Sequence, residues 1–175
     1  DDSGLVIPPK LAPIQVVIVP IYKGEDQLDS ISQVARELQR ELKLLGVSVK
    51  YDDRDTHKPG WKFNEYELKG VPLRIAIGPR DLEKRTVELA RRDTLTKETV
   101  SKDLIVDRVQ ELLSEMQKAL FNKAKNFRDS HITEVETYDE FKDVLENKTG
   151  FVSAFWDGTK ESEERIKSET KATLR

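Results

Sequence analysis

The succession of strand-like and helix-like segments between residues 15 and 51 constrains the fold of this chain most. Gln15–Tyr22 is a β-branched run that predicts a buried strand. Apolar residues then recur at helical spacing from 28 to 45, with Asp26 as the expected N-cap and Gly46 as the expected C-cap. A second strand is expected at Val47–Tyr51. A strand, a long amphipathic helix and a strand form a βαβ unit with parallel strands.

The residues that follow extend this unit into a mixed sheet. A short helix is expected at Lys62–Lys69, and the apolar run Pro72–Gly78 predicts a third strand. Thr86–Ala90 and Thr96–Val100 have the alternation of an antiparallel hairpin packed on one side. The sequence therefore predicts an α/β domain with three parallel strands, two crossover helices and a hairpin.

A long helix and a small unit complete the chain. Ser101 is the expected N-cap of the helix, and its apolar face carries Ile105, Val109, Leu112, Met116, Leu120, Ala124 and Phe127. Beyond it, Tyr138–Leu145 predicts a helix, Phe151–Trp156 a strand and Thr159–Thr170 a charged helix. We therefore expect a linker at 1–13, a domain at 14–130, and a small, incomplete α/β extension at 131–175.

Composition excludes several kinds of site. The 175 residues include no cysteine and two histidines, so disulfides, thiolate nucleophiles, Cys-ligated metals and His-rich metal sites are not expected. The longest apolar run, Val16–Ile21, is far too short to span a membrane. The acidic first residues do not resemble a signal peptide, which indicates a cytosolic protein. Because residue 1 is not Met, we expect the sequence to be a piece of a longer protein.

Charge is distributed unevenly along the chain. The net charge is −3, which by itself argues against a nucleic-acid binder, yet residues 58–92 hold nine basic and five acidic side chains. Trp61, Phe63 and Tyr66 are interleaved with them. Exposed aromatic rings beside cations suit single-stranded RNA, since rings stack on bases and cations bind phosphates. The alternative is that the three aromatic residues simply pack their helix on the sheet.

An acidic turn, Asp52–Asp55, follows the second strand. Because open α/β sheets hold ligands at the carboxyl ends of their strands, one interpretation is a pocket for a divalent metal or a phospho-acceptor. Such a pocket also needs an Asp after the third strand, where Gly78 and Pro79 stand, so a structural turn is favoured. No glycine-rich phosphate loop occurs, and neither His57 nor His131 has the partners of a catalytic triad.

Several ordered motifs resemble a known family. They are Leu11–Ile21 (LAPIQVVIVPI), Tyr51–Asp55 (YDDRD), Pro59–Phe63 (PGWKF), Tyr66–Arg74 (YELKGVPLR) and Ile77–Asp81 (IGPRD). In this order and spacing they resemble the anticodon-binding domain of class II prolyl-tRNA synthetases, densely over residues 5–100. Residues 138–175 are similar to the C-terminal extension of the archaeal/eukaryote-like form.

The resemblance implies a five-stranded mixed sheet with three helices, the class IIa anticodon-binding fold. It implies a parent enzyme that activates proline with ATP, attaches it to proline tRNA and forms a homodimer. The catalytic motifs of the family lie upstream, so this chain is expected to bind tRNA, neither DNA nor a membrane, and to catalyse nothing alone. ATP and magnesium belong to the catalytic domain, and the chain itself is expected to be a cofactor-free, cytoplasmic monomer.

The resemblance also implies an anticodon site. Its residues are Phe63, Glu67, Arg74, Arg80 and Asp81. The chemistry agrees, because proline anticodons carry two guanines, whose N1–H and N2–H₂ groups a carboxylate accepts and whose O6 and N7 an arginine reaches. A phenylalanine ring offers a stacking face. The family often has Lys at the position of Arg80.

In one respect the sequence departs from the family. The extension commonly binds zinc through cysteines, one of them beside the position of Asp157, and this chain has none. We therefore expect no zinc. Two alternatives remain open: the equivalent domain of a threonyl, histidyl or glycyl synthetase, and a free-standing interaction module on the same fold.

Overall fold

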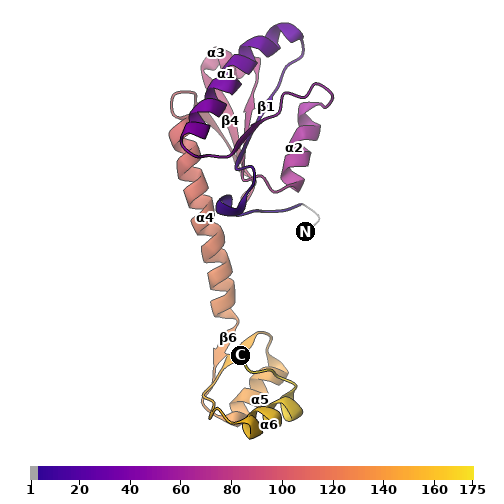
Figure 1. Cartoon of the computed structure of the whole chain (residues 1–175), viewed down its shortest axis with the longest axis vertical. Coiled ribbons are helices and arrows are strands. Elements are labelled where there is room, and N and C mark those ends of the chain that lie inside the picture. The colour runs from indigo at the N-terminus through magenta and orange to yellow at the C-terminus, as the bar shows by residue number, and fades with distance from the viewer. Residues whose placement is uncertain (1–3) are drawn as a thin grey trace. The chain divides into compact units, whose positions relative to one another are not determined.

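The structure, a computed structural model, describes residues 4–175, and for Glu25 and Asp26 it describes only the backbone (Figure 1). The chain forms two compact units, one up to Leu120 and the other Phe121–Arg175. The division falls inside a helix, whereas the sequence placed it after residue 130. We call the two parts unit 1 and unit 2 and describe each by itself.

Unit 1 is built on a five-stranded sheet in the order β2-β1-β3-β4-β5. Its strands are β1 (Val16–Pro20), β2 (Val49–Tyr51), β3 (Leu73–Ile77), β4 (Thr86–Arg91) and β5 (Lys97–Ser101). β1 pairs in parallel with β2 and β3, while β3–β4 and β4–β5 are antiparallel. The predicted mixed α/β sheet is therefore confirmed, including the central place of β1, whose residues are all buried on both faces.

The first face of the sheet is covered by two long helices, α1 (Glu25–Leu44) and α4 (Ile105–Ser130). Leu73, Ile75 and Ile77 point to this face from β3 and pack in the main core with apolar residues of α1 and α4. α1 begins two residues earlier than predicted, with Gly24 at the N-cap, so Asp26 lies in the first turn; its side chain lies outside the described residues. Gly46 follows the last turn with a positive φ of 78°.

α4 starts later than predicted. Ser101 is not its N-cap, because Ser101 is the last residue of β5 and pairs with Thr86 of β4. The helix begins at Ile105, and its apolar face is buried as far as Met116. Phe127, predicted on the same face, is 67% exposed, because the apolar partners of this face belong to the sheet of unit 1.

The second face of the sheet, which we call the α2 face, carries Val17 and Val19 from β1 and Arg74 from β3. α2 (Pro59–Leu68) packs here, with Tyr66 and Val71 against the two valines. In Figure 1, α1 and α2 lie on opposite sides of the sheet. A short helix that the sequence did not predict, α3 (Pro79–Lys84), connects β3 to β4.

The residues before β1 lie against unit 1. Leu5 N–H donates to the carbonyl of Leu68 at 3.1 Å, and the Gln15 side chain donates to Pro9 O at 3.0 Å. A 3₁₀ turn, η1, covers Pro9–Leu11. The described part of the expected linker is therefore hydrogen-bonded to the domain that follows it.

Unit 2 is a small βαβ arrangement followed by one more helix. β6 (Ile132–Glu134) and β7 (Phe151–Ser153) form a parallel pair, connected by α5 (Tyr138–Asn147), and α6 (Lys160–Thr170) follows. The sequence predicted α5 and α6 but not β6. β7 ends at Ser153, not at Trp156 as predicted, because its partner β6 has only three residues.

Candidate nucleic-acid interface

A hollow of about 250 Å³ opens on the α2 face of unit 1. Side chains of α2, β3 and the β4–β5 hairpin surround it: Phe63, Tyr66, Glu67, Val71, Arg74, Ala90, Arg91, Arg92, Leu95 and Lys97. Three of the five predicted anticodon residues, Phe63, Glu67 and Arg74, are therefore brought together. We call this place the α2 hollow.

Arg74 lies at the centre of the α2 hollow. Its guanidinium carbon is 3.5 Å from the centroid of the Phe63 ring, and its Nη2 is 4.0 Å from carboxylate oxygens of both Glu67 and Glu88. The side chain is only 7% exposed, and its Nη1 has no hydrogen-bond partner in the described part of the chain. Burial lowers the pKa of Arg74, and Glu88 and Glu67 oppose that shift. A buried, charged donor without a partner is costly, and an incoming acceptor would satisfy it.

The local sequence explains how these side chains meet. Phe63 and Glu67 are four residues apart on α2 and share a helix face. Arg74 alternates along β3 with the core residues Leu73 and Ile75, so it points to the opposite face.

The sequence left two interpretations of the aromatic residues of α2 open: stacking on RNA bases, or packing of the helix on the sheet. Tyr66 is 2% exposed and packs the helix on the sheet. Phe63 is half-buried beneath Arg74, whereas Trp61 is 48% exposed. Core packing therefore explains Tyr66 but not Trp61.

Arg80 and Asp81 do not line the α2 hollow. They lie in α3, directly beyond the carboxyl end of β3, while Arg74 is near the amino end of that strand. Gly78 N–H donates to Asp81 Oδ2 at 2.8 Å, so one carboxylate oxygen already caps the start of α3. Arg80 is exposed, and its guanidinium has no partner among the described residues. The role of this pair in anticodon binding stays a prediction.

Three polar residues of the hairpin were not predicted as site residues. Glu88 lies between Arg74 and Lys97, whose Nζ is 3.7 Å from its carboxylate. Arg92 Nε donates to the carbonyls of Glu67 at 3.0 Å and Leu5 at 2.9 Å, which ties the hairpin to the end of α2. The register could have identified Glu88, because it lies opposite Ala76 and hence on the α2 face.

The acidic turn after β2 is structural. The carboxylate of Asp52 is buried and accepts two hydrogen bonds from the Arg54 guanidinium, at 2.8 and 2.6 Å, one from the Arg54 backbone N–H at 3.2 Å and one from the Tyr66 hydroxyl at 3.1 Å. Lys62, also buried, lies 3.6 Å from it. Burial alone would raise the pKa of Asp52, but the Arg54 bonds and the Lys62 charge outweigh it and hold the pKa far below its usual range. Asp52 therefore joins β2 to α2 and is not available as a metal ligand or phospho-acceptor.

Asp157 of unit 2 does not fit a zinc site. One of its carboxylate oxygens accepts the backbone N–H of Thr159 at 2.9 Å and the Ser162 hydroxyl at 2.5 Å, so it helps to cap α6. Among the described side chains, which leave out those of Glu25 and Asp26, no group of three His, Cys, Asp or Glu could hold a metal ion. The donors around Asp157 are backbone and hydroxyl groups, not the sulfur or nitrogen ligands that zinc prefers.

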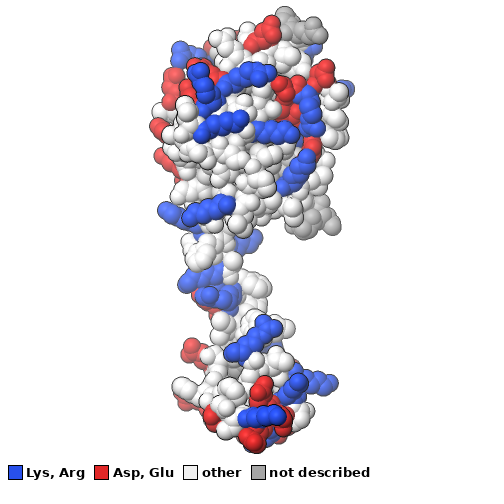
Figure 2. All heavy atoms as spheres, in the orientation of Figure 1, with Lys and Arg blue, Asp and Glu red and all other residues white. Residues whose placement is uncertain are grey.

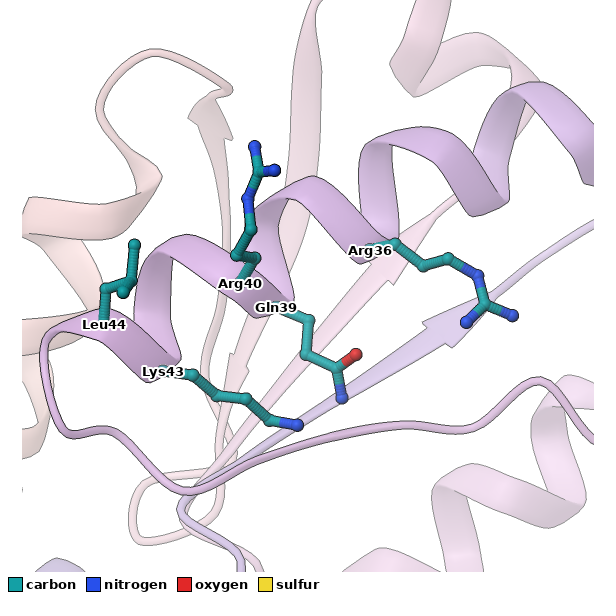
Figure 3. A pocket seen from close by; sticks show the side chains of 5 residues that line it. All are labelled: Arg36, Gln39, Arg40, Lys43 and Leu44. Atoms are coloured by element: carbon teal, nitrogen blue, oxygen red, sulfur yellow. The ribbon is translucent and has the colours of Figure 1, made fainter.

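A second hollow, of about 300 Å³, lies on the outer surface of α1 (Figure 3). It is lined by Arg36, Gln39, Arg40, Lys43 and Leu44. Lys and Arg side chains are prominent on the face of unit 1 seen in Figure 2. In Figure 3, however, Gln39 and Lys43 point to one side of the helix and Arg40 to the other, and Arg36 is paired with Asp53 at 3.1 Å. The lining charges therefore do not converge on one ligand.

No helix of the described chain combines the length and the apolar character needed to cross a membrane.

Residues 15–112 match the family model of the anticodon binding domain, and residues 138–175 match that of the prolyl-tRNA synthetase C-terminal region. The first match includes the entire sheet and the α2 hollow.

Similar curated proteins are named proline--tRNA ligases. Over its whole length the chain is 64% identical to a proline--tRNA ligase of Christiangramia forsetii, 61% to one of Flavobacterium psychrophilum and 59% to one of Porphyromonas gingivalis. It spans 36%, 36% and 35% of the length of these relatives. The fold, the α2 hollow and these matches together show that the chain belongs to the anticodon binding domain family, in the form that occurs in proline--tRNA ligases.

Proposed function

We propose that this chain binds tRNA through its anticodon, as part of a proline--tRNA ligase that uses ATP to attach proline to tRNA. The observation that carries the proposal is the α2 hollow, in which a stacking ring, a carboxylate and a buried arginine donor converge. These are the groups that an unpaired guanine requires: a plane for stacking, an acceptor for N1–H and N2–H₂, and a donor for O6 or N7.

In the free chain the guanidinium of Arg74 covers the ring of Phe63. For a base to stack on Phe63, the Arg74 guanidinium must turn away from the ring, which directs its N–H groups to O6 or N7 of the base. The neighbouring Glu67 carboxylate, about half exposed, can then accept from the Watson–Crick edge. Arg80 and Asp81 supply a second arginine–carboxylate pair for the other guanine.

The test is binding of a short RNA hairpin whose loop carries the proline anticodon UGG. Glu67→Ala and Asp81→Ala should each weaken binding by about 1–3 kcal/mol. Because Asp81 also caps α3, Asp81→Asn is the better variant: its amide oxygen can still accept from Gly78 N–H, but the carboxylate is lost. Glu83→Ala, an exposed change on the same helix, is the control. Equal binding by Glu67→Ala and wild type would contradict the site.

Specificity for proline tRNA is tested by competition. Gel shifts with proline, threonine, histidine and glycine tRNAs should show the tightest binding for the proline isoacceptors. Preference for another tRNA would favour a different class II synthetase, and no tRNA binding would favour a free-standing interaction module.

The remaining parts of the proposal concern subtype, assembly and cofactors. We place the chain with the archaeal/eukaryote-like form because residues 138–175 resemble the C-terminal extension of that form, and we expect a cytoplasmic enzyme that is a homodimer as a whole. ATP and magnesium would act outside these 175 residues. The chain alone should be monomeric in light scattering and free of zinc in elemental analysis; a tight dimer or stoichiometric zinc would contradict these expectations.

A further inference from the structure

A partly exposed aromatic pair lies at the start of α2, outside the α2 hollow. Trp61 is in the first turn of the helix and is 48% exposed, while Lys62 beside it is buried. His57, from the turn that follows β2, stacks on the Trp61 ring with centroids 3.8 Å apart and planes inclined by 27°. The Thr56 hydroxyl is 2.8 Å from His57 Nδ1 and helps to orient the imidazole.

An ion-paired guanidinium lies beside this pair. The guanidinium carbon of Arg54 is 5.6 Å from the centroid of the Trp61 ring. Arg54 is itself held by the buried Asp52 carboxylate and by Glu65, at 2.6 and 2.5 Å. Because Arg54 is bound on both sides, the cation and the stacked rings form a preorganised group rather than flexible surface side chains.

The pair lies at the same edge of the sheet as Arg80 and Asp81. The turn that carries His57 begins at the carboxyl end of β2, and α3 begins at the carboxyl end of β3. Both strands run parallel to β1, which lies between them. Two strands separated by a third are about 10 Å apart, so a single-stranded loop at Arg80 is within reach of the pair.

We propose that His57 and Trp61 form a stacking platform for a further unpaired base of the bound RNA loop. The inference rests on the proposed function. Stacked aromatic rings held in a fixed position suit the face of an unpaired base. A protein partner is less well matched, because the exposed sequence neighbours Lys58, Gly60 and Asn64 are polar or small.

Trp61 provides its own optical probe. The chain has two tryptophans, so in the Trp156→Phe variant all tryptophan emission comes from Trp61. Titration with the UGG hairpin should quench this emission, with the same midpoint as binding measured by anisotropy of the labelled hairpin. A fully base-paired RNA duplex, whose bases are not free to stack, should leave the emission unchanged.

Substitutions give a second readout. Trp61→Ala should weaken hairpin binding by about 5- to 30-fold and His57→Ala by less, in line with the cost of losing one base–aromatic stack. Trp61→Phe keeps an aromatic face and should retain most of the affinity. Phe121→Ala, which removes a still more exposed ring from α4, should have no effect. Circular dichroism establishes that each variant is folded.

The outcomes separate this inference from the proposed function. If wild type binds the hairpin and Glu67→Ala weakens this binding while Trp61→Ala does not, the stacking platform is overturned and the anticodon site stands. The exposed face of Trp61 would then be assigned to contact with a protein partner. Equal quenching by duplex and hairpin would overturn stacking in favour of phosphate contact. If wild type does not bind the hairpin at all, the proposed function itself fails.

Discussion

Unit 1 and unit 2 bury very different amounts of apolar surface. In unit 1 the sheet is packed on both faces, with a main core against α1 and α4 and a smaller one against α2. In unit 2 the buried apolar residues, within the described chain, are Val135 and Phe141, while Phe151 and Phe155 are 68% and 97% exposed. Burial of apolar area is the main source of stability, so unit 1 should be much the more stable.

Side-chain capping at the N-termini of α1 and α2 is, in contrast, weaker than at the N-termini of the helices of unit 2. The N-caps of α1 and α2, Gly24 and Lys58, make no side-chain capping bond. In unit 2 the Thr137 and Thr159 hydroxyls accept backbone N–H groups at the starts of α5 and α6. Unit 1 is therefore held by contacts between residues distant in sequence, and unit 2 depends more on interactions within a few residues.

The largest effect is expected in the core of unit 1. Ile75→Ala removes a fully buried side chain from the central part of the sheet and should lower the free energy of unfolding by about 4 kcal/mol. Urea denaturation followed by Trp61 emission in the Trp156→Phe background measures it. Phe155→Ala in unit 2, followed by Trp156 emission in the Trp61→Phe background, is the counterpart and should change stability by less than about 0.5 kcal/mol. Similar losses of unfolding free energy for the two variants would contradict the expected difference in stability between unit 1 and unit 2.

Asp52→Asn should have the next largest effect, about 3 kcal/mol, because it leaves Arg54 and the buried Lys62 without their carboxylate. The pKa of Asp52 is lowered on folding, so its stabilisation is complete above the unfolded value of about 4. It is lost as the pH falls below that value towards the folded pKa. Wild type should lose stability there and the variant should lose less; parallel pH profiles would contradict this.

In unit 2 a glycine should be the most sensitive position. Gly150 has a φ of 126°, and a Cβ there would collide with the backbone carbonyl of His131, next to the β6–β7 pairing. Gly150→Ala should cost about 2 kcal/mol. Gly158→Ala, also at positive φ but in open space, should cost about 1 kcal/mol. Trp156 emission in the Trp61→Phe background reports both, and reversal of their order would refute the steric argument.

The smallest effect is expected at a helix cap. Thr137→Ala removes the hydroxyl that accepts Glu140 N–H at the start of α5 and should cost about 1 kcal/mol. Thr137→Ser keeps the hydroxyl and is the control. Hydrogen exchange of the first turn of α5 provides the measurement; unchanged exchange in Thr137→Ala would show that unit 2 does not depend on this cap.

Much of the fold could be predicted because the signals are local and periodic. The β1–α1–β2 succession and the β4–β5 hairpin follow from hydrophobic spacing alone. α3 was missed because it is six residues long with no buried residue, and β6 because it is three residues long. Ser101 resembled a helix cap, and only its pairing with Thr86 made it the end of a strand.

For the site, the sequence by itself determined which chemical groups are present. Helical spacing put Phe63 and Glu67 on one face of α2, and strand alternation turned Arg74 away from the main core. The family motifs indicated the role of these residues. Only the tertiary structure decided which groups meet. It placed Arg74 over Phe63 with an unpartnered Nη1, separated Arg80 and Asp81 from the α2 hollow, buried Asp52 and left Trp61 stacked on His57. The physical reason is that periodicity fixes the direction of a side chain on its own element, whereas its partners depend on how distant elements pack.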